Sequence, residues 1–361
     1  MKILLVGEFS GLHNNLKEGL LKLGHEVVLA STGDGWKKFP SDINWLPTRF
    51  KGRLGYLEYL YKQYKLSRNL KDFDVVQFIS NNQIFEKRLG LNNICYTNLI
   101  KNNKKSFFVI AGGDSVIWQY WLNTKDYKLS NLIKQTNKLD LDKKLVKYFL
   151  SHREKLKTLK LLKKANGIIP IMYEYAQPYR ELSNICSTIP IPINCDKIKF
   201  IKNNVSSKLI VFHGLNRRGA KGTEYVEEAF EILRKKHPND LELIIAGNMK
   251  YKEYIEFIKR VNIIIDQTNS YSLGINGLVS LAQGKITMGG AEIEGLKELG
   301  YESCPVINIT PNSQDIVKKI EELLEQKNQL SELSKQSRIF VEKYHNHITI
   351  AKKYLEVWES K

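Results

Sequence analysis

Short apolar runs alternate with amphipathic segments along the first half of the chain. An apolar run at residues 2–6 is followed by leucines at helical spacing and by a second apolar run at 27–30. Strands that alternate with helices form parallel sheets, so this pattern predicts a Rossmann-like α/β unit. We expect further strands at 74–78, 106–110 and 167–171, and helices at 56–70 and 83–101.

The same pattern starts again in the second half. Strands are expected at 209–212, 241–246, 263–265 and 306–307, and helices at 224–236, 250–259, 274–283, 315–326 and 329–344. The proline-containing run TIPIPI at 188–193 and a polar run at 202–207 separate the two halves. We therefore predict an N-terminal α/β domain over 1–195, a second over 206–345, and a C-terminal helix over 346–361 that returns to the first domain.

A net charge of +18 over 361 residues predicts attraction to polyanions, whether nucleic acid, an anionic membrane or phosphorylated substrates. We expect no nucleic-acid partner, because the chain has neither an aromatic–basic RNA motif nor a helix-turn-helix pattern. The four cysteines lack metal-binding spacing, so we expect no metal and a reduced, cytoplasmic protein. The opening MKILLVGEFSG is too short in apolar residues for a signal peptide or membrane span.

A basic amphipathic segment at 139–164 predicts one long helix. Its leucines and aromatic residues recur near helical spacing, with Lys and Arg between them. Two interpretations stay open: a core helix with a solvated face, or a helix that lies on the inner, anionic face of a membrane. The second would make the protein peripheral to the membrane.

The stretch 261–300 has the form of a ligand-binding edge. Its buried strand delivers Asp266 to a carboxyl end, and a polar loop leads to a helix that begins near Gly274. A second strand then ends in Gly289-Gly290 before an acidic segment with Glu292 and Glu294. Because ligands of open α/β sheets bind beyond the carboxyl ends of strands, we predict a pocket for a phosphorylated molecule.

The loop after the 209–212 strand carries the strongest phosphate-binding signal. Glycines there allow close approach to the backbone, arginine offers a planar fork and lysine a compact charge. A solvated basic turn is the alternative, and the loop is not a Walker A motif because its lysine precedes the glycine. The residues concerned are Gly214, Arg217, Arg218, Lys221 and Gly222.

Two loops of the first half are candidates for a second ligand. Gly11 and His13 follow the first strand, in a loop that does not match the dinucleotide pattern G-x-G-x-x-G. Gly113 and Asp114 follow the 106–110 strand, where Asp114 is equally suited to cap a helix.

These motifs resemble GT-B glycosyltransferases of the retaining, family-4-like kind found in bacterial polysaccharide synthesis. The similarity rests on His213-Gly214 through Arg218 to Lys221-Gly222, on Tyr271-Ser272-Leu273-Gly274 after the 263–265 strand, and on Ala282-Gln283-Gly284-Lys285. Gly24-His25-Glu26-Val27 and the terminal helix match the first domain and the cross-over helix of that family. The implied fold is two Rossmann-like domains that face a cleft.

The chain departs from this family at its paired glutamates. The E-x7-E positions carry Tyr271 and Val279, neither of which supplies a carboxylate. Asn276 or Ser272 could instead contact sugar or phosphate, and Glu292 or Glu294 could bind a hydroxyl. The alternative for each is a helix cap or a surface residue.

The resemblance implies sugar transfer from a UDP- or GDP-sugar to a glycan or lipid-linked acceptor, without a metal or permanently bound cofactor. It places catalysis on Arg218, Lys221 and Asn276. It implies acceptor binding by Gly11, His13, Gly113 and Asp114. A binding module without catalysis and a nucleotide-sugar epimerase are the alternatives. The implied donor-binding residues are Gly214, Arg217, Arg218, Lys221, Gly222, Asp266, Tyr271, Ser272, Leu273, Gly274, Asn276, Glu292 and Glu294.

Overall fold

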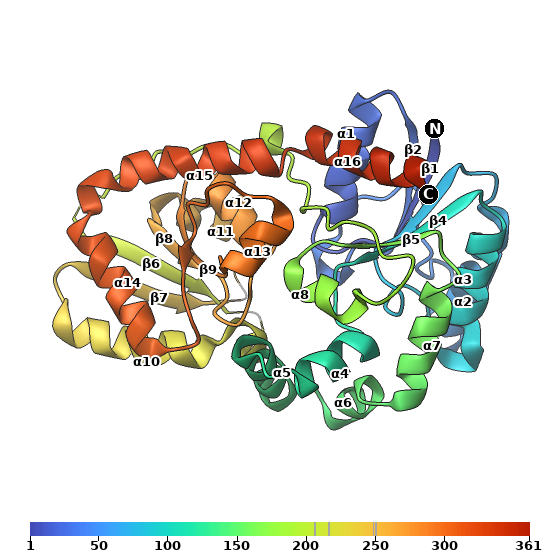
Figure 1. The fold of residues 1–361 in the computed structure, drawn as a ribbon, viewed down its shortest axis with the longest axis horizontal. Helices are drawn as coiled ribbons and strands as arrows, with labels where there is room; N and C mark the ends of the chain where they lie inside the picture. The colour runs from blue at the N-terminus through green and yellow to red at the C-terminus, as the bar shows by residue number, and fades with distance from the viewer. Residues whose placement is uncertain (206, 216, 248, 250) are drawn as a thin grey trace.

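Two five-stranded parallel β-sheets, each covered by helices, form the two halves of the molecule (Figure 1). The structure is a computed structural model that describes residues 1–361 except 206, 216, 248 and 250. The predicted second domain and the predicted helix 250–259 therefore begin at positions outside the described residues. The predicted α/β class with two parallel-sheet domains is confirmed.

The first sheet has the strand order β2-β1-β3-β4-β5. Its strands are nearly continuous apolar runs because helices cover both faces, which leaves no solvated side. The strands are β1 Lys2–Val6, β2 Glu26–Ala30, β3 Val75–Phe78, β4 Lys105–Ile110 and β5 Gly167–Pro170. The helices are α1 Leu12–Lys22, α2 Gly52–Asn69, α3 Leu91–Lys101, α4 Ser115–Asn123, α5 Tyr127–Leu139, α6 Lys143–Phe149, α7 His152–Leu162 and α8 Tyr173–Ala176.

The second sheet has the order β10-β9-β8-β6-β7. Its strands are β6 Leu209–Gly214, β7 Leu241–Ala246, β8 Ile263–Ile265, β9 Ile286–Gly289 and β10 Ile307–Asn308. Its helices are α9 Arg218–Lys221, α10 Thr223–Lys236, α11 Tyr251–Arg260, α12 Ile275–Ala282, α13 Ile293–Leu299, α14 Ser313–Glu325 and α15 Leu330–Tyr344.

Each sheet has a point where the strand order reverses. It lies between β1 and β3 in the first sheet and between β6 and β8 in the second. The loops that leave these strands diverge to opposite sides, which opens a crevice suited to ligands. In the second sheet those loops are 214–222 and 266–274, the two that the sequence singled out.

Two helix predictions were wrong in detail. The segment 139–164 is not one helix, because α6 ends at Phe149 and Ser151 starts α7 by accepting a hydrogen bond from the Glu154 N–H. The predicted helix 83–101 begins only at Leu91, after a 3₁₀ turn at Arg88–Gly90. Within the described part of the chain, no helix has the length and apolar character needed to cross a membrane.

The chain passes between the two halves twice, and the two passages are hydrogen-bonded to each other. The Ile193 N–H donates to the His345 carbonyl at 2.7 Å, and the His347 N–H donates to the Ile193 carbonyl at 3.2 Å. After the second passage, α16 (His347–Ser360) packs against α1 of the first sheet (Figure 1). The packing is close at Gly19, where a Cβ would lie 2.2 Å from the His347 carbonyl oxygen.

Candidate functional site

The loops after β6 and β8 meet at Gly222. This residue has a φ of +65°, and a Cβ on it would lie 2.0 Å from the Thr268 hydroxyl. The Thr268 N–H also donates to the Lys221 carbonyl at 3.2 Å. Only glycine permits both the left-handed backbone and this approach, so Gly222 holds the two loops together.

Lys221 and Asp266 form a buried ion pair at this junction. Their closest atoms, Nζ and Oδ1, are 3.3 Å apart, and the side chains are 6% and 4% exposed. The second carboxylate oxygen of Asp266 is buried without a hydrogen-bond partner. It faces the start of α12, because a Cβ on Gly277 would lie 2.9 Å from it. A buried oxygen without a hydrogen-bond partner lowers the stability of the fold, and such groups are found mainly at functional sites.

His213 contacts residues that lie close to this pair in the chain. Its ring is fully buried and contacts the Ile265 carbonyl at 3.0 Å through Nδ1 and the Thr223 hydroxyl at 2.9 Å through Nε2. Burial, followed by the charge of Lys221, lowers the His213 pKa to about 3. The neutral imidazole therefore links β6, β8 and α10 without adding a cation.

The other predicted donor residues differ in burial and in their contacts. Arg217, Asn276 and Glu294 are exposed. Gly214 at the end of β6 and Gly274 before α12 are half-buried. Leu273 packs in the hydrophobic core, and the buried Ser272 hydroxyl has no hydrogen-bond partner. Arg218 forms an ion pair with Glu227 at the surface.

The two positions of the family's glutamates have other tasks here. Tyr271 is buried, its hydroxyl donates to the Asp126 carboxylate, and its ring lies 4.7 Å from that of Tyr173. Val279 packs against the hydrophobic core. No carboxylate replaces either glutamate at its own position.

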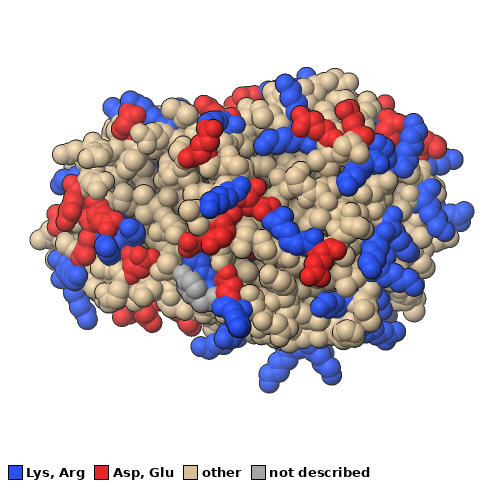
Figure 2. All heavy atoms as spheres, viewed as in Figure 1, with Lys and Arg blue, Asp and Glu red and all other residues tan. Residues whose placement is uncertain are grey.

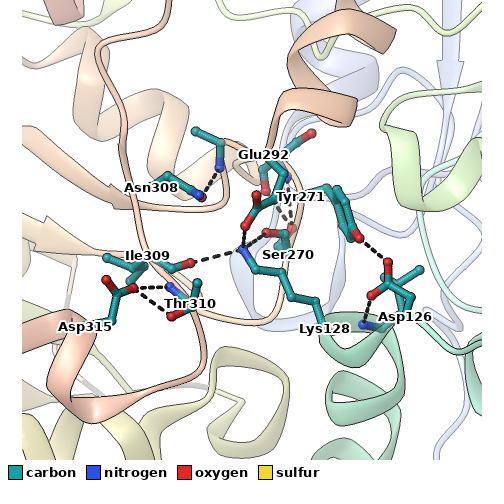
Figure 3. A network of polar contacts seen from close by, with 12 residues as sticks. Asp126, Lys128, Ser270, Tyr271, Glu292, Asn308, Ile309, Thr310 and Asp315 are labelled. Carbon is teal, nitrogen blue, oxygen red and sulfur yellow. Dashed lines mark hydrogen bonds and ion pairs between the residues drawn. The ribbon is translucent and has the colours of Figure 1, made fainter.

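Helix α5, which the sequence analysis missed, bridges the two halves (Figure 3). The ammonium group of Lys128, buried with its side chain, forms an ion pair with Glu292. It also donates to the carbonyls of Ile309 at 3.1 Å and Ser270 at 3.4 Å. Glu292, a predicted hydroxyl ligand, is thus held by a lysine of the first half.

The rest of α5 contacts the same loops. Asn131 donates to the Asn269 side chain at 2.7 Å, and Asn269 donates to Gln135 at 3.1 Å. At the end of the helix, the Asp140 carboxylate accepts hydrogen bonds from the N–H groups of Gly219 and Ala220, at 3.0 and 2.7 Å.

The sequence contains a signal for α5. Asp126 accepts a hydrogen bond from the Leu129 N–H as a helix cap, and Lys128, Asn131 and Gln135 lie three and four residues apart. Such spacing places polar side chains on one helical face. The hydrophobic pattern alone did not show that this polar face meets protein rather than water.

Glu174 is a further site residue, and the sequence contains no signal for it. It lies in α8 of the first half, is buried, and accepts a hydrogen bond from the Ser270 hydroxyl at 2.5 Å. Burial raises its pKa above the usual range, and its second carboxylate oxygen has no partner. A cavity of about 20 Å³ lies nearby, lined in part by Met172, Tyr271 and His345. It has room for one water molecule, so the domain surfaces must separate before a larger ligand enters there.

The first-half candidates are placed by the β1 and β4 loops. His13 is fully buried between the Gly7 carbonyl at 2.8 Å and Gln77 at 3.2 Å, and burial lowers its pKa to about 4. Its ring is closed to an acceptor in this arrangement. Gly11 adopts a φ of +92° and donates its N–H to Glu8.

Asp114 is buried and caps α4 by accepting hydrogen bonds from the N–H groups of Val116 and Ile117. A helix cap was the predicted alternative to acceptor binding for this residue. Its other oxygen accepts hydrogen bonds from Asn81 and Tyr179. Gly113 is half-buried, and a Cβ on it would lie 2.4 Å from the Trp118 indole nitrogen.

Comparison with known proteins shows the class of fold. No protein-family model matches the sequence, and a search of curated proteins finds no match. Among solved structures, sucrose-phosphate synthase from Thermosynechococcus elongatus matches with a TM-score of 0.64 at 14% identity, over 100% of this chain and 99% of that one. HepE from Anabaena, solved with UDP and glucose, matches with a TM-score of 0.61 at 12% identity over 100% of both chains.

A glycosyltransferase from Rickettsia africae matches with a TM-score of 0.57 at 15% identity, over 99% of this chain and 97% of that one. These likenesses extend over whole chains, so they include both sheets and the returning C-terminal helix. The chain has the GT-B fold. At such identities the likeness concerns architecture, and the activity has to be argued from the site.

Proposed function

We propose that this protein is a glycosyltransferase that moves a sugar from a UDP- or GDP-sugar to a glycan or lipid-linked acceptor. The reaction would serve cytoplasmic steps of bacterial surface-polysaccharide synthesis. The observation that carries the proposal is the position of Lys221, Arg218 and the 266–274 loop at the strand reversal of the second sheet in a GT-B fold. The full-length likeness to HepE, which was solved with UDP and glucose, supports a nucleotide-sugar donor.

The donor diphosphate would bind between the loops 214–222 and 266–274. Lys221 would exchange the Asp266 carboxylate for a phosphate oxygen, and Arg218 would exchange Glu227. Backbone N–H groups of residues 271–276 and the side chain of Asn276 would stabilise the departing diphosphate. Glu292 and Glu294 are the candidates for a sugar or ribose hydroxyl.

The acceptor would bind on the loops of the first sheet. Because His13 and Asp114 are buried and engaged, they would act by holding the loop backbones at Gly11 and Gly113. Retention without a metal follows if a phosphate oxygen of the leaving group deprotonates the acceptor hydroxyl on the same face of the sugar. This chemistry needs no carboxylate nucleophile, in contrast to retaining glycoside hydrolysis.

A thermal-shift screen with UDP, GDP, CMP and their sugars tests the donor assignment. A ligand that binds only the folded state raises the melting temperature. Sugar transfer to candidate acceptors, followed by mass spectrometry, then tests the activity. Absence of any shift with the whole set would refute the proposal.

A binding module without catalysis is the second candidate, favoured by Tyr271 and Val279 at the glutamate positions. It predicts a thermal shift with a nucleotide sugar but neither transfer nor hydrolysis. An epimerase would convert the donor without an acceptor.

A further inference from the structure

Helix α2 exposes an apolar stripe in addition to the apolar side chains that it packs against the core. Its fully buried residues, Gly55, Gln63 and Ser67, are small or polar, and Tyr59 and Leu66 pack partly buried against the core. The outward side chains include Leu54, Leu57, Tyr61 and Tyr64. A helix at a protein surface normally turns its apolar stripe toward the core. The outward residues lie beyond this packing, so they form a candidate contact surface.

The outward residues form a continuous stripe. They lie three and four residues apart, and Leu54, Leu57 and Tyr61 are 60%, 59% and 62% exposed. Phe50 extends the stripe before the helix begins. Leu89 is 94% exposed and has a left-handed backbone with a φ of 55°, an unfavourable conformation for leucine. We call these six residues the α2 face: Phe50, Leu54, Leu57, Tyr61, Tyr64 and Leu89.

Cations surround the α2 face. Figure 2 shows Lys and Arg side chains along the right-hand side of the molecule, the end that carries α2 and α3 in Figure 1. Glu58, the acid within α2, is occupied by the N–H groups of residues 48–50 and by Lys62. Among the described residues of this region, Lys62 is the one cation that forms an ion pair. The exposed cations are Arg49, Lys51, Arg53, Lys65, Arg68 and Arg88.

An open hollow beside the α2 face combines these two features. It is lined by Gly52, Arg53, Tyr56, Leu57 and Arg88. The Arg88 guanidinium lies 5.3 Å from the centre of the Tyr56 ring, and the Tyr56 hydroxyl is buried without a hydrogen-bond partner. Two guanidinium groups and a hydroxyl donor suit phosphate oxygens. The hollow joins Leu57 of the stripe to Arg88, which precedes Leu89 in the chain.

We propose that the α2 face binds an anionic lipid bilayer, with Arg53 and Arg88 at the phosphates and the leucines inserted among the acyl chains. Leucine with tyrosine on one helical face, flanked by cations, is the composition of helices that lie in a membrane interface. A second copy of the chain would place the same cations against each other, which opposes pairing. The proposal does not depend on sugar transfer.

The segment 139–164 is the other candidate for a membrane-binding surface. In that segment Leu145, Leu150 and Leu156 are 37%, 36% and 53% exposed, and the break between α6 and α7 divides them. The continuous stripe is on α2. A comparison of the two surfaces therefore supplies the control.

Co-sedimentation of the full chain with vesicles tests the proposal. We expect binding to vesicles that contain phosphatidylglycerol, weak binding to pure phosphatidylcholine, and a decrease with salt. L54Q/L57Q should lower the partition coefficient roughly tenfold or more, because two leucines lose their insertion. R53Q/R88Q should weaken binding to the anionic vesicles and leave the weak binding to phosphatidylcholine unchanged.

L156Q is the matched control, since it removes an exposed leucine from a basic helix elsewhere on the same domain. It should bind vesicles as the wild type does. All variants change exposed residues, and circular dichroism should show an unchanged fold. Absence of wild-type binding, equal binding by L54Q/L57Q, or a larger loss in L156Q would overturn the proposal. So would a wild-type dimer without lipid that L54Q/L57Q abolishes.

Discussion

Replacement of Lys221 by methionine should destabilise the protein strongly, although the change is conservative in size. The Asp266 carboxylate would remain buried without its counter-ion, in a position that is 4% exposed. D266N should have a similar effect on Lys221. The double variant K221M/D266L, which removes both charges, should recover most of the loss.

The structure gives the magnitude. At 3.3 Å, and with an effective dielectric constant of about 20, the attraction between two unit charges is about 5 kcal/mol. Removal of one partner of a buried pair costs about 3–5 kcal/mol, whereas replacement of both by apolar groups is often neutral or stabilising. We therefore expect each single variant to lose about 3–5 kcal/mol and the double variant to lie within about 1 kcal/mol of the wild type.

Urea unfolding followed by circular dichroism measures these differences. Lys335 and Glu332 provide the control, because they form an ion pair at 3.2 Å with side chains that are 58% and 62% exposed. K335M should change the free energy of unfolding by less than about 0.5 kcal/mol. The two pairs thus share chemistry and distance and differ in burial.

The same variants separate stability from donor binding. UDP or a UDP-sugar should raise the melting temperature of the wild type, and this shift should be absent in both K221M and K221M/D266L. A single variant within about 1 kcal/mol of the wild type would refute the buried-charge argument. A full ligand shift in the stable double variant would remove Lys221 from the donor site.

Three further predictions follow from the packing. G222A should lower the free energy of unfolding by more than G24A in thermal unfolding, because both glycines have positive φ but only a Cβ added at Gly222 would meet Thr268, at 2.0 Å. Burial raises the pKa of Glu174, so the stability that its protonated form contributes is present below the unfolded pKa and is lost as pH rises through the folded pKa. The melting temperature of E174Q should therefore rise relative to that of the wild type between about pH 4.5 and about pH 8. K128M should expose α5 to limited proteolysis within 127–139 at lower protease concentration than wild type, because the link to Glu292 is lost.

The sequence predicted much of the fold because its strands are continuous apolar runs with clear ends. The strand 263–265 and its delivery of Asp266 to a carboxyl end agree with the structure. One helix was predicted over 139–164 because the leucine spacing continues across Leu150. In the structure the chain breaks there, because Ser151 caps the start of α7. Local hydrogen bonds of this kind decide helix ends more than hydrophobic periodicity does.

The candidate site was harder to predict, because its environment comes from residues distant in sequence. Lys221 was predicted to be a phosphate ligand, and its burial against Asp266 depends on the meeting of two loops 45 residues apart. His13 was predicted to contact the acceptor, whereas tertiary packing buries it completely. Glu174 carries no local motif, and the spacing that includes Lys128 indicates a polar helix face but not that this face meets the other half.

The paired passages at Ile193 and at 345–347 restrict how the two halves can move. Because these two adjacent segments are hydrogen-bonded to each other, we expect them to form the hinge when the halves open and close. They also make the first domain discontinuous in sequence. A fragment that ends at residue 195 would lack α16 and leave the Gly19 side of α1 uncovered, so genetic dissection of this protein requires a fragment in which residues 346–361 are joined to the first 195.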